Sequence, residues 1–181
     1  MTTKTTKPTV SKPPAIVIDT REQLPYAFEG YETVRGTLAT GDYSLVGCEN
    51  LVAVERKSKA DAYQCVGAHR DRFTRCLERL AGMDRGCVVI ECSLKQFTKP
   101  PSRTRIDAAM AVGSYLSWAC KYRIPIFWAG DREYAERLTV RFLAAFLKYR
   151  YSLVTGPVGP WAGSGLSSLS SPVATSDLGR A

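Results

Sequence analysis

The stretch that decides the fold is residues 51–61, which read LVAVERKSKAD. An apolar run of strand length passes directly into a series of charged side chains. Side chains alternate between the two faces of a strand, so one face is expected to carry Ala53, Glu55 and Lys57 and the other Val52, Val54 and Arg56. A carboxylate and an ammonium group on one strand face can reach the same metal-bound phosphate, which suits metal-dependent phosphodiester hydrolysis. An edge strand with a surface salt bridge is the alternative, and other stretches must decide between the two.

Length and composition predict one domain with tails. At 181 residues and 45% hydrophobic content, the chain can bury one core of ordinary size. Lysine and arginine number 25 against 17 aspartate and glutamate residues, so the formal net charge is +8. This excess favours a polyanionic partner, although many membrane-surface and merely soluble proteins are also basic.

The six cysteines argue against a zinc site. They are scattered with no C-x-x-C pair, and His69 is the only histidine. Several lie in apolar runs, where a reduced thiol behaves as a small hydrophobic group, so we expect a reducing, intracellular compartment. No apolar run approaches the length of a membrane span, and the N-terminus lacks a hydrophobic signal core. Neither a membrane span nor secretion is therefore expected.

The N-terminal part leads to a polar cluster at a strand end. Residues 1–14 are mainly Thr, Lys and Pro and are expected to form a disordered basic tail. Residues 15–19, AIVID, predict a short buried strand, and Asp19, Arg21 and Glu22 gather where it ends. Ligands bind at the carboxyl ends of strands in α/β sheets, which makes this cluster a candidate site. A turn with a local ion pair is the alternative.

A weak strand is expected within residues 32–38, and a further strand after Asp42. Gly41 allows a tight backbone before this aspartate, and the residues that follow suit a strand. Asp42 could also be an ordinary turn aspartate. Residues 47–50 are expected to form a hairpin connection into the strand within residues 51–57.

A helix is expected to begin at residues 58–61, SKAD, which match a capping box. The carboxylate of Asp61 can bond the first helical amides, which is a complete structural explanation, and it can also face a metal ion. Further along, an apolar stripe at helical spacing is formed by Phe73, Cys76, Leu77 and Leu80.

Basic side chains gather near this segment, mostly on another helix face. They are Lys59, Arg70, Arg72, Arg75 and Arg79. Most are arginine, whose planar guanidinium binds phosphate in a fork. We therefore expect part of this helix to contact a nucleic-acid backbone. An ordinary solvated charged face is the alternative.

The second half alternates strands with helices. Residues 87–92, CVVIEC, form a continuous apolar run typical of a strand covered on both faces. Residues 94–105 are expected to form a basic loop. A second capping-box match at residues 104–107 predicts a helix to about Lys121, with an inward stripe of Ile106, Ala109, Met110, Gly113 and Leu116.

A short strand within residues 124–128 and a last helix after Gly130 complete the domain. The helix should face the core with Leu138, Phe142, Ala145, Phe146 and Tyr149. Residues 153–181 are rich in Gly, Ser and Pro and are expected to form a disordered tail. The folded part is therefore placed at residues 15–152, as an α/β layered domain.

Four charged segments follow one another along the chain: residues 17–22, VIDTRE; residues 41–43, GDY; residues 54–61, VERKSKAD; and residues 88–91, VVIE. Their order resembles the nuclease domain of the XPF-type structure-specific endonucleases, whose pattern is D-x-R-E, then G-D, then E-R-K-x-x-x-D. Several motifs in order are far more specific than any one of them. The resemblance implies a restriction-endonuclease-like α/β core, with a mixed central β-sheet flanked by helices. It also implies cleavage of DNA at branch points, flaps and forks with Mg²⁺ or Mn²⁺.

The resemblance assigns roles to the matching residues. Metal would be held by Asp42, Glu55 and Asp61, with Asp19 and Glu22 completing the acidic cluster. Lys57 would orient or activate the attacking water, and Arg21 and Arg56 would hold carboxylates or the scissile phosphate. The chemistry agrees, because clustered carboxylates repel one another and a divalent cation neutralises their charge. The same cation would polarise a phosphoryl oxygen.

The chain also departs from the family. Typical members continue into tandem helix-hairpin-helix modules, and the Gly/Ser/Pro-rich segment offers none. We therefore expect either a homodimer, a partner subunit or a minimal single-domain enzyme. A metal-dependent DNA endonuclease acting in repair, recombination or replication is the main hypothesis. A catalytically silent module that binds DNA or a partner is the alternative, although Asp42, Glu55, Lys57 and Asp61 are all present.

Overall fold

A computed structural model describes residues 13–102 and 104–155 of the chain. The tails expected at residues 1–14 and 153–181 lie outside these ranges, apart from two residues at the end of the first and three at the start of the second. The last three belong to the final helix, which continues to Thr155.

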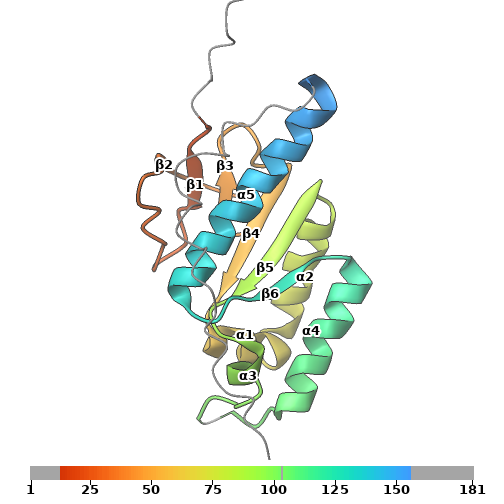
Figure 1. Cartoon of the computed structure of the whole chain (residues 1–181). Helices are drawn as coiled ribbons and strands as arrows, with labels where there is room; N and C mark the ends of the chain where they lie inside the picture. Colours follow the sequence, from red (N-terminus) through yellow and green to blue (C-terminus); the bar gives the residue numbers. More distant parts are fainter. Residues whose placement is uncertain (1–12, 103, 156–181) are drawn as a thin grey trace, which may run out of the picture.

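A mixed six-stranded sheet forms the centre of the fold, with strand order β2-β1-β3-β4-β5-β6 (Figure 1). The strands are β1 (Ile16–Asp19), β2 (Thr33–Gly36), β3 (Tyr43–Leu45), β4 (Val52–Lys57), β5 (Arg85–Ile90) and β6 (Ile126–Trp128). The strand β3 runs antiparallel to both of its neighbours, β1 and β4, whereas the other pairs are parallel. The predicted hairpin between β3 and β4 is confirmed.

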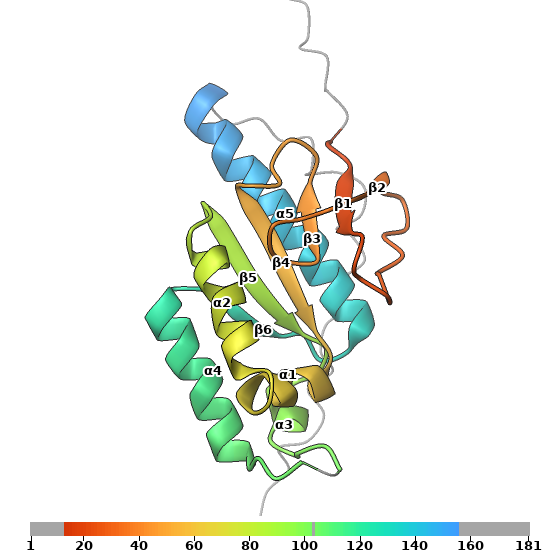
Figure 2. The same ribbon diagram turned by 180° about the vertical axis from the view of Figure 1, so that it is seen from behind.

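Helices cover both faces of this sheet. They are α1 (Lys59–Val66), α2 (Arg70–Ala81), α3 (Leu94–Phe97), α4 (Ala108–Tyr122) and α5 (Arg132–Thr155). The long helix α5 crosses one face (Figure 1), and α1, α2 and α4 lie on the other (Figure 2). The prediction of an α/β domain with a mixed sheet flanked by helices is confirmed. Of the helices in the described residues, none has the length and apolarity needed to cross a lipid bilayer.

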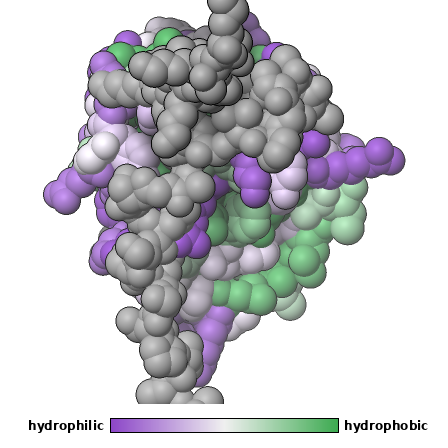
Figure 3. All heavy atoms as spheres, turned by 45° about the horizontal axis from the view of Figure 1, so that its top comes forward, coloured by the Kyte–Doolittle hydropathy of each residue, from purple (hydrophilic) through white to green (hydrophobic). Residues whose placement is uncertain are grey.

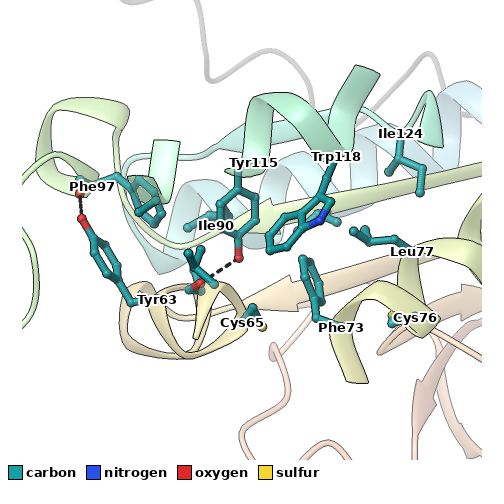
Figure 4. Close-up of a cluster of buried hydrophobic side chains, with 14 of the residues drawn as sticks. Tyr63, Cys65, Phe73, Cys76, Leu77, Ile90, Phe97, Tyr115, Trp118 and Ile124 are labelled. Carbon is teal, nitrogen blue, oxygen red and sulfur yellow. Dashed lines mark hydrogen bonds between the residues drawn. The ribbon is translucent and has the colours of Figure 1, made fainter. Parts of the chain in front are cut away.

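Two hydrophobic cores, one on each face of the sheet, confirm the alternation predicted for β4. Ala53 belongs to the core under α1, α2 and α4, whereas Val52 and Val54 belong to the core under α5. The first core is rich in aromatic rings (Figure 4), and the ring of Trp118 lies 5.2 Å from that of Phe73. Burial of both faces explains why the first half of β4 and nearly all of β5 are continuously apolar.

The capping prediction for α1 and the apolar stripe of α2 are both confirmed. The side chain of Ser58 accepts a hydrogen bond from the backbone N–H of Asp61 at 3.1 Å. The chain then breaks at Gly67 and starts a second helix, whose buried side chains are Phe73, Cys76, Leu77 and Leu80.

The predicted start and inward face of α4 are wrong. Asp107 caps the helix, accepting from the backbone N–H of Met110 at 2.9 Å, and Thr104 lies outside it. Its buried side chains are Ala111, Tyr115 and Trp118, whereas Met110 and Leu116 are 55% and 54% exposed. The two large aromatic rings of Tyr115 and Trp118 take the core positions, and the Tyr115 hydroxyl donates to the backbone oxygen of Ala62 at 3.0 Å.

As a result, α4 leaves apolar side chains in solvent. Figure 3 shows hydrophobic side chains gathered on one side of the molecule, the side on which Figure 1 places α4. Single exposed apolar residues are common on proteins, and here two of them, Met110 and Leu116, lie on one helix.

Two further expectations need correction. Residues 94–105 contain the short helix α3, which has a capping box between Ser93 and Gln96 and is anchored by the buried Phe97. Arg103, within that predicted loop, lies outside the described residues. On α5, Phe146 is buried as predicted, but Tyr149 is 68% exposed because Leu143 and Leu147 take the core positions.

Candidate active site

Charged side chains meet at one edge of the sheet because of the strand directions. The strands β1, β4 and β5 run the same way, and β3 runs against them, so their ends and its start share an edge. Backbone hydrogen bonds join the charged positions there: Asp19 N–H donates to Asp42 O at 2.9 Å, and Glu91 N–H donates to Lys57 O at 2.9 Å. Segments far apart in sequence thus converge on one place, as expected for α/β sheets.

A cavity of about 260 Å³ opens at this edge. It is lined by Arg21, Glu22, Gln23, Leu24, Asp42, Arg56, Lys57 and Asp61. Six of these are residues that the sequence singled out, so the cavity brings together most of the predicted site. A larger hollow of about 460 Å³ lies between α1 and residues 101–106, but no predicted site residue lines it.

Asp42 is held by the backbone of β4. Its N–H donates to the oxygen of Val54 at 2.8 Å, and its Oδ2 accepts from the N–H of Arg56 at 2.7 Å. The preceding Gly41 has φ +80°, and a Cβ there would lie 2.8 Å from that of Ala53. The backbone can therefore approach β4 this closely only with glycine.

Glu55 and Lys57 form an ion pair through Glu55 Oε1 and Lys57 Nζ. The ammonium group also donates to the oxygen of Arg56 at 3.1 Å and lies 5.8 Å from the ring centre of Phe73 on α2. Burial acts to lower the pKa of Lys57, but the charges of Glu55 and Asp42 outweigh it and raise this pKa. In the metal-free site, Lys57 is therefore a charged hydrogen-bond donor.

The electrostatics of Asp42 fit a divalent cation. Burial, together with the negative charge of Glu55, raises the pKa of Asp42 to about 8. Two hard carboxylate donors whose charges oppose each other are the donor set that Mg²⁺ or Mn²⁺ binds. Within residues 13–102 and 104–155, however, no group of three or more His, Cys, Asp and Glu side chains is arranged as a ready metal site. The fit therefore rests on Asp42 and Asp61, which line the cavity, and on Glu55, which is buried, pairs with Lys57 and does not itself line it.

Within the described residues, the Asp61 carboxylate does not bond the helical amides as the capping alternative expected, and its place on the cavity wall leaves the metal role a prediction. Its Oδ2 accepts a hydrogen bond from the Ser58 hydroxyl at 2.7 Å, which fixes the carboxylate at the start of α1. The side chain is nevertheless exposed and lines the cavity.

Asp19 and Glu22, which the sequence grouped together, have different surroundings. Asp19 is buried and does not line the cavity. Its carboxylate accepts hydrogen bonds from Arg21 Nε at 2.8 Å and from the backbone N–H of Leu38 at 2.8 Å. Burial acts to raise the pKa of Asp19, but these hydrogen bonds hold it below its usual value. Glu22 lines the cavity, 3.5 Å from Arg56 Nη1.

Glu91 and Arg132 were not given a role from the sequence. The Glu91 carboxylate forms ion pairs with Arg56 Nε at 2.8 Å and with Arg132 Nη1 at 2.8 Å. One carboxylate thus joins β4 to the start of α5. Arg132 also donates to the backbone oxygens of Leu24 and Pro25 at 2.6 Å and 2.8 Å, on the cavity wall. Glu91 directly follows a buried parallel strand, and this position could have marked it as a site residue. No comparable signal in the sequence marks Arg132.

The basic side chains fall into two groups. In the described part of the chain, the exposed side chains of Arg72, Arg75 and Arg79 form no hydrogen bond or ion pair. Arg70 instead stacks 4.9 Å above the ring of Trp118 and donates to the Ser114 hydroxyl at 3.4 Å. Lys59, at the first position of α1, is partly buried.

Comparisons with known proteins agree with this geometry. A family model of the ERCC4 domain matches residues 18–142. The fold resembles a solved structure of XPF from Aeropyrum pernix, which is 20% identical, has a TM-score of 0.58, and is matched over 74% of this chain and 61% of that chain. A structure of XPF from Aeropyrum pernix in complex with DNA is 21% identical, has a TM-score of 0.58, and is matched over 76% and 66%.

This chain thus covers less than two thirds of either XPF chain. A search of curated proteins found no match. The similarity of fold confirms the predicted restriction-endonuclease-like architecture. Since the family match spans more than half of its length, this chain belongs to the ERCC4-domain family, and its described residues form an XPF-type nuclease domain.

Proposed function

We propose that this chain is a divalent-metal-dependent endonuclease that hydrolyses phosphodiester bonds in DNA at branched, flap or fork structures, in repair, recombination or replication. The observation that carries the proposal is that Asp42, directly before β3, and Lys57, on β4, line one open cavity, and that Glu55 pairs with Lys57. The family assignment supports it independently.

The metal ligands would be Asp42, Glu55 and Asp61, with Glu22 on the opposite wall of the cavity. A bound Mg²⁺ or Mn²⁺ would polarise the phosphoryl oxygen and neutralise charge that develops on it. The pairing of Asp19 with Arg21 supports a different role for Asp19, which is to hold the arginine at the cavity mouth.

Lys57 would hold the attacking water or a phosphate oxygen by donating a hydrogen bond. The charges of Glu55 and Asp42 raise the pKa of Lys57, which favours the charged, hydrogen-bond-donating form of this side chain. Arg21, whose side chain is 66% exposed, would contact the phosphate backbone. Arg56, which is held by Glu91, would fix the geometry of the cavity floor.

The DNA backbone would approach along α2. Phe73 and Cys76 of this helix contact Lys57 and Glu55, so the exposed Arg72, Arg75 and Arg79 lie beside the site. One solved relative of this fold is a complex with DNA, which supports the same partner here. Lys59 and Arg70 would add positive charge at the edge of this surface.

A second copy of this chain or a partner subunit would complete the grip on a junction. The exposed apolar side of α4, with Met110 and Leu116, supports such a contact. Leu116→Asp should lower the mass measured by sedimentation if the chain associates through this side.

The test is a panel of labelled DNA substrates: single strand, duplex, flap, fork and four-way junction, each with Mg²⁺, Mn²⁺ or EDTA. Cleavage of the branched substrates with metal, and its loss in Asp42→Asn, is the expected result. Binding without cleavage under every cation would support a silent DNA-binding module instead.

A further inference from the structure

The Glu55 carboxylate has a buried thiol on the side away from Lys57. Oε1 pairs with Lys57, and Oε2 lies 3.3 Å from Sγ of Cys76 on α2. The Thr40 hydroxyl lies 3.3 Å from the same sulfur. The three side chains are nearly inaccessible, at 9%, 8% and 3% exposure for Glu55, Cys76 and Thr40.

The direction of these hydrogen bonds follows from the chemistry of the groups. The Cys76 thiol lies within hydrogen-bond distance of a carboxylate oxygen and of a hydroxyl, and it has one proton to donate. An ionised carboxylate can only accept, so the thiol donates to Glu55 and the Thr40 hydroxyl donates to the sulfur. The result is a short series of hydrogen bonds from Thr40 through Cys76 to Glu55.

These hydrogen bonds restrict the orientation of the Glu55 side chain. A glutamate has several rotatable bonds, and here each of its two oxygens has a separate partner from a different element. Without the thiol, both oxygens would be free to turn toward the ammonium of Lys57. Such a bidentate pair would neutralise the carboxylate and withdraw it from a cation.

We propose that Cys76, supported by Thr40, is a positioning residue that fixes the orientation of the Glu55 carboxylate and keeps its second oxygen from pairing with Lys57, so that Glu55 can serve as a ligand for a divalent cation. The inference rests on the proposed function, because it assumes that Glu55 is a metal ligand. Cys76 lies on the helix that carries the exposed arginines, at the margin of the aromatic core (Figure 4). Groups that hold a ligand in this way commonly change metal affinity by about 10- to 100-fold.

The matched control is Cys87 on β5. It is also completely buried, but it belongs to the core on the α5 side of the sheet. In the described residues its side chain makes no hydrogen bond. Cys87→Ala therefore also removes one buried thiol, but it changes no contact of the Glu55 carboxylate.

The experiment measures Mn²⁺ binding to the full chain by electron paramagnetic resonance, without DNA, and thermal unfolding of the same samples. Cys76→Ala should weaken Mn²⁺ binding about tenfold. Cys76→Ser, which keeps a donor, should bind within about threefold of the unchanged protein. Thr40→Val, which keeps the shape but removes the hydroxyl, should also weaken binding even if Cys76→Ala does not fold. Cys87→Ala should lower the melting temperature and leave Mn²⁺ affinity unchanged.

Equal Mn²⁺ affinity in Cys76→Ala, Thr40→Val and Cys87→Ala would overturn the inference and leave the proposed function intact. Failure of the unchanged protein to bind Mn²⁺ would overturn the proposed function, and the inference with it. The two failures are therefore separate results.

Discussion

The backbone N–H of Arg56 donates a 2.7 Å hydrogen bond to Oδ2 of Asp42. This bond ties the first carboxylate of the cavity to the strand that carries Glu55 and Lys57. The site is therefore built on paired backbone and not on a free loop, which favours precise placement of catalytic groups.

Lys57→Met should remove cleavage without removing DNA binding. The charged donor is lost, while the apolar stem keeps its contact with Phe73. Loss of one such donor should lower the single-turnover rate on a labelled flap by about 10²–10³-fold. Binding, measured by fluorescence anisotropy with Ca²⁺, should change by no more than about twofold, because the basic surface of α2 is unaltered.

Lys121→Met is the control for this substitution. Lys121 lies in the last turn of α4, is exposed, and does not line the cavity. Equal loss of rate in both variants would show that general charge, and not the site, is responsible.

The paired strands could be predicted because their sequence signals are local. Alternation in residues 51–57 placed Val54 and Glu55 on the correct faces, and the capping signal at Ser58 marked the start of α1. Convergence at a sheet edge follows from strand direction, so the grouping of Asp42 with Lys57 was also within reach.

The rest depends on tertiary packing that spacing does not specify. Several faces of α4 are apolar, and the choice between them is made by Tyr115 and Trp118 finding space against α2. The contact of Cys76 with Glu55 joins a helix and a strand 21 positions apart, and no short motif marks it.

Arg56→Met should destabilise the fold. Both Arg56 and Glu91 are about 10% exposed, and Glu91 would keep only Arg132 as a partner. We expect the unfolding free energy to fall by about 3 kcal/mol in urea titrations, the lower end for breaking a buried pair. Arg137→Met, which breaks an exposed pair with Glu133 on α5, should cost less than about 0.5 kcal/mol. Similar costs for the two variants would contradict the assigned role of Glu91.

The stability of the metal-free protein should depend on pH through Asp42. Its folded pKa of about 8 exceeds the unfolded value of about 3.9, so between these values the folded state holds the extra proton. That contribution is complete below about pH 4 and is lost as pH rises through 8, by at most about 1.4 kcal/mol per pH unit. In EDTA, the melting temperature should therefore fall from pH 6 to pH 9 more steeply than that of Asp42→Asn. Parallel curves would contradict this assignment.

Replacing Arg72 and Arg75 together by alanine should weaken DNA binding uniformly across sequences. Both side chains are exposed on α2, and each would contribute one phosphate contact. The slope of log affinity against log salt should shrink by about 2 in anisotropy titrations. Arg137→Ala with Arg141→Ala, on the helix that covers the opposite face of the sheet, should leave the slope unchanged. An unchanged slope in the α2 variant would mean that DNA approaches from elsewhere.

Gly41→Ala should disturb the site and the fold together, and Gly47→Ala separates the two causes. Both glycines have a left-handed backbone, with φ +80° and +79°, so a side chain at either position costs about 1–2 kcal/mol. At Gly47 a Cβ would meet nothing within 4 Å, whereas at Gly41 it would lie 2.8 Å from the Cβ of Ala53 and 3.1 Å from the oxygen of Val54. The clash should cost about 1–3 kcal/mol more in urea unfolding and push Asp42 away from the amide of Arg56. Gly41→Ala should therefore lower both stability and the cleavage rate, whereas Gly47→Ala should lower only stability, and by less. Equal effects of the two substitutions would mean that the close approach of Gly41 to β4 does not position Asp42.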